Sequence, residues 1–239
     1  MATNCKAGEK LATCVRILAM RGLIGLFGHI SVYEPEVGRV LISPGKGSDK
    51  AAMHCSDLAV LDLSGRALEG QGPVEWPIHT ALHASQADAL AVAHLHSPYA
   101  TLFAIAKRKF QPVTLQGSMF LDGIPVYPGA HLITTPALGQ EVANLMGSKR
   151  AALLRSHGIV VVGRDIEEML YSVLVFEDNA LKAVQAATLG ELHFLTAEEC
   201  QAHEEGSSVQ YRARRAWHCF TQMEARWDRQ PASGLSPYV

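Results

Sequence analysis

The sequence contains no apolar run approaching the ~18 residues that a membrane-spanning helix requires. It also has little excess charge of either sign: the formal net charge is -2 over 239 residues, which does not indicate a nucleic-acid or anionic-membrane partner. Residues 1–22 carry lysine and glutamate within their apolar pattern, unlike a secretory signal peptide. We therefore expect a cytoplasmic protein with no membrane partner and no nucleic-acid partner.

Closely spaced cysteine pairs are also lacking. The five cysteines, at positions 5, 14, 55, 200 and 219, form no Cys-x-x-Cys motif. Wide spacing of this kind is typical of isolated reduced thiols in a cytosolic protein, and we predict neither a disulfide framework nor a thiolate metal site.

The apolar content, 48% against 18% charged residues, is sufficient for one substantial core, and we see no tandem repeat or linker. We therefore expect a single domain over residues 1–239. Periodicity predicts helices and strands that interleave, which indicates an α/β fold with a mixed sheet between two helical layers. The expected helices are 8–21, 77–85, 97–108, 135–147, 165–189 and 208–227, and the strands lie within 26–45, 58–70, 89–96, 123–128 and 151–163. Ser97 is the expected N-cap of the third helix.

The stretch AVAHLHSPYA places two histidines at the end of a predicted strand. Side chains at i and i+2 on a strand share a face, so His94 and His96 point together while Leu95 points into the core. The pair alone is equally compatible with ordinary polar residues at a strand end. A third histidine, His157, ends the run AALLR and precedes a glycine. Three imidazoles at one sheet edge would suit a catalytic divalent-metal site with an open position.

Glu75 precedes a predicted helix that begins near Pro77. A carboxylate beside a metal could be a fourth ligand or a general acid/base. It could also be an ordinary glutamate favoured by the helix dipole.

Six segments, taken in order, resemble the class II aldolase/adducin family: FGHIS, LISPG, EWPIHTALH, AVAHLHSPYAT, LLRSHGIVVVG and EEMLYSVLVFEDNA. The resemblance covers roughly residues 8–190, and residues 208–239 would add a helix and tail. It implies a three-layer α/β/α fold and a homotetramer with active sites between subunits. It also implies that His94, His96 and His157 hold the metal and that Glu75 moves protons. Zinc suits three imidazoles, with manganese, iron or cobalt left open.

The sequence departs from the sugar-phosphate members of this family at their phosphate-binding elements. The family's Gly-Asn is Gly-His29 here, and its Ser-Ser pair before Glu75 has become Pro73-Val74, which carries no hydroxyl donor. The loop with Ser43 and Gly45 is retained. These residues, with His29 and Lys46, are our candidate substrate contacts, although His29 could serve only the neighbouring loop and Lys46 could be an ordinary loop lysine.

Another departure concerns the tyrosine with which the aldolases protonate the leaving aldehyde. Its position aligns with Gln116. Tyr238, near the C-terminus, is a candidate substitute.

The Gly-His-x-Ser motif resembles the family branch that decarboxylates hydroxylated aromatic acids, such as the dihydroxyphthalate decarboxylases. We therefore favour a metal-dependent lyase that decarboxylates a non-phosphorylated hydroxylated aromatic or ring-derived acid. The alternatives are an aldolase acting on a hydroxy-oxo acid or ketose, and a non-catalytic adducin-like interaction module.

Overall fold

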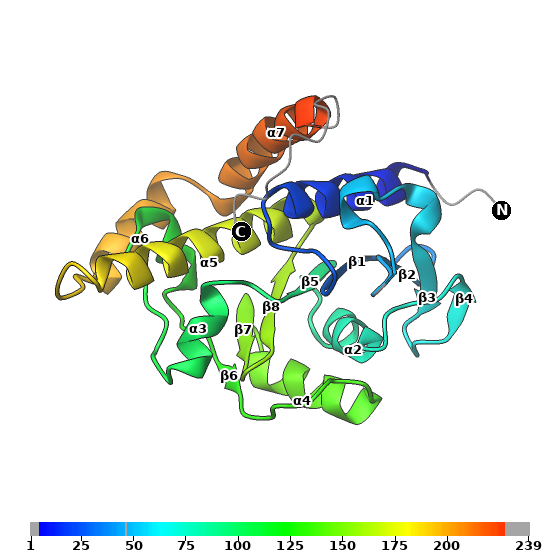
Figure 1. Cartoon of the computed structure of the whole chain (residues 1–239), viewed down its shortest axis with the longest axis horizontal. Helices are drawn as coiled ribbons and strands as arrows, with labels where there is room; N and C mark the ends of the chain where they lie inside the picture. The colour runs from blue at the N-terminus through cyan, green and yellow to red at the C-terminus, as the bar shows by residue number, and fades with distance from the viewer. Residues whose placement is uncertain (1–4, 46, 228–239) are drawn as a thin grey trace.

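The computed structural model describes residues 5–45 and 47–227, in which eight strands form one sheet between two layers of helices (Figure 1). The α-helices are α1 (Cys5–Met20), α2 (Trp76–Ser85), α3 (Ala100–Ile105), α4 (Pro136–Met146), α5 (Ile166–Ala186), α6 (Ala197–Gly206) and α7 (Val209–Trp227). The strands are β1 (His29–Glu34), β2 (Arg39–Ile42), β3 (Ala59–Asp62), β4 (Ala67–Glu69), β5 (Ala91–Leu95), β6 (Val126–Tyr127), β7 (Ala151–Leu154) and β8 (Gly158–Gly163). Short 3-10 helices, η1 (Lys50–Ala52), η2 (Cys55–Asp57) and η3 (Leu115–Phe120), lie in the connections.

The sheet has the strand order β4-β3-β2-β1-β5-β8-β7-β6. The pairs β1–β2 and β3–β4 are the two antiparallel hairpins that the turn residues predict, and β2 also pairs antiparallel with β3. Strand β6 pairs with β7 in parallel, so the sheet is mixed, as expected. Its centre joins β1, β5 and β8, three strands that are far apart in the sequence.

Apolar clusters cover both faces of the sheet, and the two largest are separate from each other. The larger cluster packs α1, α3, α5 and part of α7 against one face. The smaller one packs α2 and α4 against the other, and Figure 1 shows these two helices on the opposite side of the sheet from α1, α5 and α7. The expected α/β fold with helices on both sides of a mixed sheet is confirmed.

Most predicted helix boundaries lie close to the observed ones, but two assignments were wrong. Helix α3 begins at Ala100 with Tyr99 as its N-cap, not with Ser97. The hydroxyl of Ser97 still accepts a 3.3 Å hydrogen bond from the backbone N–H of Ala100, and it donates to the buried carboxylate of Glu177, which lies far away in the sequence. The second error is α6, whose charged sequence gave no apolar periodicity, although Thr196 and Glu199 form a capping box at its start.

Within residues 5–45 and 47–227, no helix combines the length and the apolar character needed to cross a membrane. In the same part of the chain, Cys14, Cys55, Cys200 and Cys219 form no disulfide, in agreement with their spacing.

Candidate metal centre and active site

Two histidines, His94 and His96, lie close together at the end of β5. His94 is the fourth residue of the strand and is fully buried, whereas His96 follows the strand and is exposed. Leu95, between them, is buried in the larger apolar cluster on the other face. The expected alternation is therefore observed, and the ring centroids of His94 and His96 lie 5.3 Å apart.

His157 reaches the same edge from a turn rather than from a strand end. Strand β7 ends at Leu154, and His157 lies in the turn that leads into β8, the strand that pairs with β5. Its ring centroid is 4.7 Å from that of His94 and 5.0 Å from that of His96. Gly158 permits this approach, because a Cβ there would lie 2.3 Å from the carbonyl oxygen of Leu95.

The three histidines fit a divalent metal by their donor chemistry. One ligand nitrogen from each lies within 4.8 Å of the others. Nδ1 of His94 lies 3.1 Å from the carbonyl oxygen of Ile159, which can only accept, so Nδ1 donates and Nε2 keeps a lone pair for the cluster. Among the described residues, the buried Nε2 atoms of His94 and His157 have no hydrogen-bond partner. Buried polar atoms without partners are costly, and a metal ion would satisfy them.

Glu75 stands directly before α2, where the sequence placed it, and is buried against the histidines. Its Oε1 accepts a 2.8 Å hydrogen bond from the backbone N–H of Ile133, while Oε2 lies 3.6 Å from Nε2 of His94 and 3.5 Å from Nε2 of His157. Burial alone would raise the pKa of this carboxyl, but the contacts with His157 and His94 outweigh it and hold the pKa well below its usual range. Glu75 is therefore a carboxylate at neutral pH.

The imidazole of His96 lies on the solvent-exposed side of the histidine cluster. Burial of the ring next to His94 and His157 lowers the pKa of His96 to about 4, although part of the side chain is open to solvent. A neutral ring is the form that binds a metal. Phe27 stacks on it at 5.3 Å between centroids and is itself 58% exposed. Sequence analysis did not identify Phe27, and an isolated aromatic residue before a glycine gave no signal.

His29 also belongs to this group. It pairs with His94 across β1 and β5, and one of its ring nitrogens forms a second close cluster with Glu75 and His94. Its Nδ1 lies 2.6 Å from Nε2 of His79, a residue for which the sequence suggested no role. Burial, followed by the neighbouring His79 and His94, holds the pKa of His29 well below its ordinary value.

The other predicted substrate contacts that the structure describes are Ser43 and Gly45. Ser43 is buried and its hydroxyl accepts a 3.0 Å hydrogen bond from the backbone N–H of Ile30. Gly45 packs on Pro73, since a Cβ at Gly45 would lie 2.9 Å from the proline Cβ. Val74 next to it is 62% exposed.

Two of the predicted contacts, Lys46 and Tyr238, lie outside the described residues. Gln116, the position that aligns with the aldolase tyrosine, is exposed in η3.

Lys50 is a buried cation that sequence analysis missed. Its ammonium donates to the carbonyl oxygen of Pro44 and, at 3.2 Å, to the hydroxyl of Ser48. Burial lowers its pKa from 10.5 to about 8. Lys50 thus fixes the Ser43–Gly45 loop through the carbonyl group of Pro44. The residues around Lys50 in the sequence are polar, so the sequence did not predict its burial.

Glu177 was also missed, and it positions the turn that follows His96. This buried residue of α5 accepts hydrogen bonds from the hydroxyl of Ser97, from the N–H of Tyr99 at 2.9 Å and from the N–H of Ala100 at 3.0 Å. The carboxylate of Glu177 therefore connects the first turn after β5 to α5.

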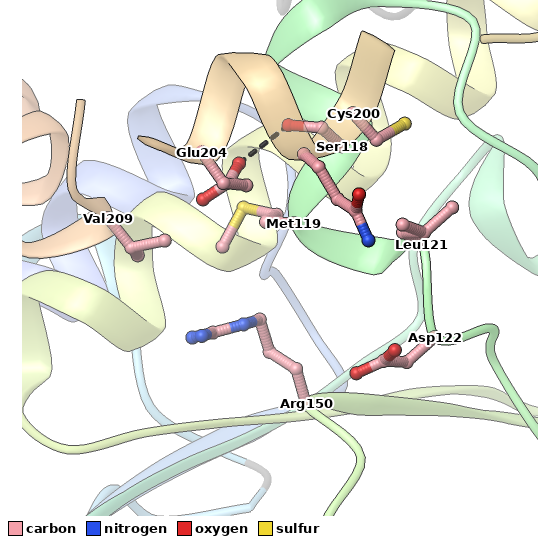
Figure 2. Close-up of a pocket in the computed structure, with 9 residues that line it drawn as sticks. Ser118, Met119, Leu121, Asp122, Arg150, Cys200, Glu204 and Val209 are labelled. Atoms are coloured by element: carbon pink, nitrogen blue, oxygen red, sulfur yellow. Dashed lines mark hydrogen bonds between the residues drawn. The ribbon is translucent and has the colours of Figure 1, made fainter. Parts of the chain in front are cut away.

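A cavity lies at the other end of β7 from the histidines, because Arg150 in its wall precedes that strand and His157 follows it. Figure 2 shows Arg150, Asp122 and Glu204 at its wall, together with Met119 from η3. The cavity is small and has charges of both signs.

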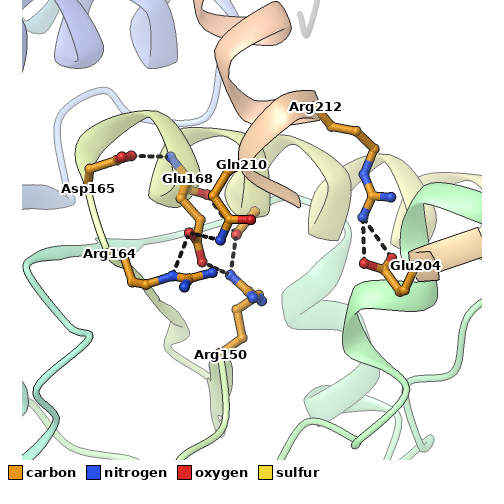
Figure 3. Close-up of polar contacts among 8 residues, drawn as sticks. Arg150, Arg164, Asp165, Glu168, Glu204, Gln210 and Arg212 are labelled. Atoms are coloured by element: carbon orange, nitrogen blue, oxygen red, sulfur yellow. Dashed lines mark hydrogen bonds and ion pairs between the residues drawn. The ribbon is translucent and has the colours of Figure 1, made fainter. Parts of the chain in front are cut away.

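The glutamate and arginine side chains near this cavity are paired with one another (Figure 3). Glu168 accepts from Arg150 at 2.5 Å, from Arg164 at 3.1 Å and from Gln210 at 3.4 Å, while Arg212 contacts both carboxylate oxygens of Glu204 at 2.7 Å. These pairs join the start of β7 and the end of β8 to α5 and α7. We therefore regard this region as structural and the histidine cluster as the candidate active site.

Comparison with known proteins finds a matching family model and several similar enzymes. The family model described as the class II aldolase and adducin N-terminal domain matches residues 9–184. A 3,4-dihydroxyphthalate decarboxylase of Arthrobacter keyseri is 30% identical over 202 residues, covering 79% of this chain and 82% of that protein. An L-fuculose phosphate aldolase of Methanococcus maripaludis is 26% identical over 180 residues, covering 74% of this chain and 95% of that protein.

Solved structures have the same fold. An L-fuculose 1-phosphate aldolase superposes with a TM-score of 0.77 at 26% identity, covering 86% of this chain and 97% of that one. An aldolase II superfamily protein from Pseudomonas syringae superposes with a TM-score of 0.82 over 95% of each chain, and its 20% identity supports the fold alone.

Proposed function

The chain belongs to the class II aldolase and adducin family, and we propose that it is a divalent-metal-dependent carbon–carbon lyase. The observation that carries this proposal is the convergence of His94, His96 and His157 beside the carboxylate of Glu75. We propose zinc as the metal because three imidazoles suit it, with manganese, iron or cobalt as substitutes. An ion bound there would supply Lewis-acid stabilisation of negative charge on a substrate oxygen.

Among lyase reactions we favour decarboxylation of a non-phosphorylated hydroxylated aromatic or ring-derived carboxylic acid. The support is the chemistry of the loops around the cluster. Pro73 and Val74 offer no hydroxyl donor to a phosphate. The similarity to 3,4-dihydroxyphthalate decarboxylases also supports decarboxylation.

Glu75 is the residue that moves the proton in this proposal. It is ionised at neutral pH, so it must first take up a proton, from the substrate or from water, before it can protonate carbon. When the bond to the carboxylate breaks, CO2 leaves and the electron pair remains on carbon. Glu75 then returns its proton to that carbon and is again a carboxylate. Decarboxylation expels no aldehyde, so it needs no acid at the position of Gln116.

The test is product analysis with metal-loaded protein and a panel of hydroxybenzoates and hydroxy-oxo acids. Release of CO2 without an aldehyde supports decarboxylation. An aldehyde product without CO2 would establish the alternative, an aldolase, which the L-fuculose phosphate aldolase relatives favour. The interaction-module alternative would win if the purified protein held no divalent metal and His96→Ala left its behaviour unchanged.

We also propose a homo-oligomer, as a tetramer with active sites between subunits, that takes a small-molecule acid as substrate. Support comes from the exposed side of the cluster, where Phe27, stacked on His96, is 58% exposed and its chain neighbour Leu26 is 68% exposed. A subunit packed against this edge would cover both side chains. Light scattering on the purified full chain measures the assembly directly. A monomer at micromolar concentration would contradict this proposal. A cytoplasmic location stays a prediction.

A further inference from the structure

Lys50 is a buried ammonium group that lacks a negative partner. The residue is 3% exposed, and its Nζ donates to two neutral acceptors, the carbonyl oxygen of Pro44 and, at 3.2 Å, the hydroxyl of Ser48. The neighbouring carboxylate of Asp49 is exposed and accepts instead from the N–H of Ala51 at 2.9 Å. Elsewhere in the part of the chain that the structure describes, no carboxylate forms an ion pair with Lys50. Burial lowers its pKa only to about 8, so at neutral pH Lys50 is mainly a cation, and a buried cation without a counter-charge is costly.

The contact with Lys50 fixes the orientation of one peptide group. The bond between Pro44 and Gly45 is trans, so its C=O and its N–H point in opposite directions. Because Lys50 holds the carbonyl oxygen on one side, the N–H of Gly45 points away from Lys50 on the other side. Within the described residues this N–H donates to no protein acceptor. A cation that binds the carbonyl oxygen also polarises the amide, which strengthens its N–H as a donor.

This peptide group lies beside the candidate active site. The backbone N–H of Ser43, just before it, donates at 2.9 Å to the carbonyl oxygen of the residue that follows His29. Gly45 packs on Pro73, two residues before Glu75, and the contact leaves no room for a side chain, because a Cβ at Gly45 would lie 2.9 Å from the proline Cβ. The loop therefore lies between the start of β1, which carries His29, and the segment that carries Glu75.

We propose that the N–H of Gly45 binds a carboxylate of the substrate and that Lys50 is the positioning residue that orients and polarises this donor. A carboxylate at Gly45 would also supply, close to the buried ammonium, the negative charge that the protein does not provide. The inference deepens the proposed function and rests on it for the reaction that the bound acid undergoes.

The carboxylate that Lys50 serves is one that remains in the product. During decarboxylation the departing carboxylate loses its negative charge as CO2 forms. A cation close to that group would stabilise the reactant more than the transition state and would slow the reaction. A cation close to a carboxylate that keeps its charge has no such effect. We therefore expect the substrate to carry a second anionic group besides the carboxylate that leaves.

Calorimetric titration of the zinc-loaded full chain with 3,4-dihydroxybenzoate and with catechol tests the inference without requiring turnover. Both probes have two adjacent hydroxyl groups that can bind a metal, and only the first has a carboxylate, so the ratio of their affinities isolates the anionic group. We expect Lys50→Met, which removes the charge, to lower this ratio by roughly tenfold, the effect of one charge-assisted hydrogen bond. Lys182→Met removes an exposed lysine of α5 and should leave the ratio as in wild type.

Equal losses of affinity for both probes in Lys50→Met would show that Lys50 only supports the loop, and would overturn the inference. A lowered ratio in Lys46→Met but not in Lys50→Met would also overturn it, because Lys46 would then hold the anion. Stronger displacement of the acid probe by inorganic phosphate than by benzoate would identify a phosphate site and overturn the assignment to a carboxylate. If the ratio depends on Lys50 while no acid releases CO2, the proposed function fails and the anion site stands.

A crystal structure of the wild-type protein with 3,4-dihydroxybenzoate bound decides the question if Lys50→Met fails to fold, which circular dichroism melting curves would reveal. We expect the carboxylate of the probe to accept a hydrogen bond from the N–H of Gly45. A carboxylate bound at any other place would overturn the inference.

Discussion

His29 and His94 face each other across β1 and β5, with their ring centroids 5.1 Å apart. This register places one candidate metal ligand directly opposite one candidate substrate contact on the neighbouring strand. A change of residue at position 29 therefore alters the wall of the site without altering the proposed metal ligands.

Removal of one imidazole is expected to abolish tight metal binding. We expect His96→Ala and His157→Ala to weaken zinc affinity by at least ~10-fold, because even residues that only orient metal ligands have effects of this size. Metal content after dialysis, measured by mass spectrometry, checks the prediction. His218→Ala, an exposed histidine on α7, is the control. Unchanged metal content in both site variants would contradict the proposed ligand set.

Gly158→Ala is expected to damage both stability and the site. The added Cβ would meet the Leu95 carbonyl oxygen at 2.3 Å, so β5 and β8 must separate where His94 and His157 approach each other. We expect a loss of about 1–3 kcal/mol in the free energy of unfolding, together with weaker metal binding. Urea unfolding and metal titration measure these two effects. Gly206→Ala, with open space around its Cβ, should change neither.

Glu177→Ala is expected to loosen the turn after His96. The Ser97 hydroxyl and the Tyr99 N–H lose the acceptor they have there, and the Ala100 N–H keeps only its longer contact with Ser97. We expect a loss of roughly 2–4 kcal/mol in unfolding free energy, with reduced metal affinity as a consequence. The neighbouring Asp178→Asn removes an exposed charge paired only with Lys182 and serves as the control. If both variants unfolded at the same urea concentration, Glu177 would not have this role.

The buried histidines predict acid sensitivity. The folded-state pKa of His83 is about 4, below its ordinary 6.5, so between these values the unfolded chain binds the additional proton. Its contribution to stability is fully present above pH ~6.5 and is lost as the pH falls toward ~4, by up to about 1.4 kcal/mol per pH unit. His79 acts in the same direction.

Urea unfolding of metal-free protein across this pH range measures the slope. We expect His83→Gln to have a shallower dependence of unfolding free energy on pH than wild type, even if it is less stable at neutral pH. An identical slope would show that His83 titrates normally in the folded protein.

The parts of the site that depend on local geometry could be predicted from the sequence. His94 and His96 share a face because strand side chains alternate, and Glu75 precedes a helix because proline favours the first helical turn. The register between strands could not be predicted this way. His157 lies in the turn between β7 and β8, and only the pairing of β8 with β5 brings it to His94.

Two of the residues without an assigned role in the sequence analysis, Ser31 and Glu177, act across long sequence separations. Ser31 reaches His79 and His83 across 48 and 52 positions, and Glu177 reaches Ser97 across 80. A histidine pair at i and i+4 on α2 was visible in the sequence. The contact of this pair with Ser31 could not be predicted, because the local sequence pattern does not specify which strand a helix covers.

The pairing of β5 with β8 also has a consequence for refolding. His94 and Ile159 are 65 positions apart, so the site forms only after a long loop has closed, which is a slow kind of step in folding. An ion that needs all three imidazoles can be captured only after this closure. Uptake of a metal with a visible absorption band, such as cobalt, would therefore report the late assembly of the sheet centre, and should lag behind the recovery of helical signal.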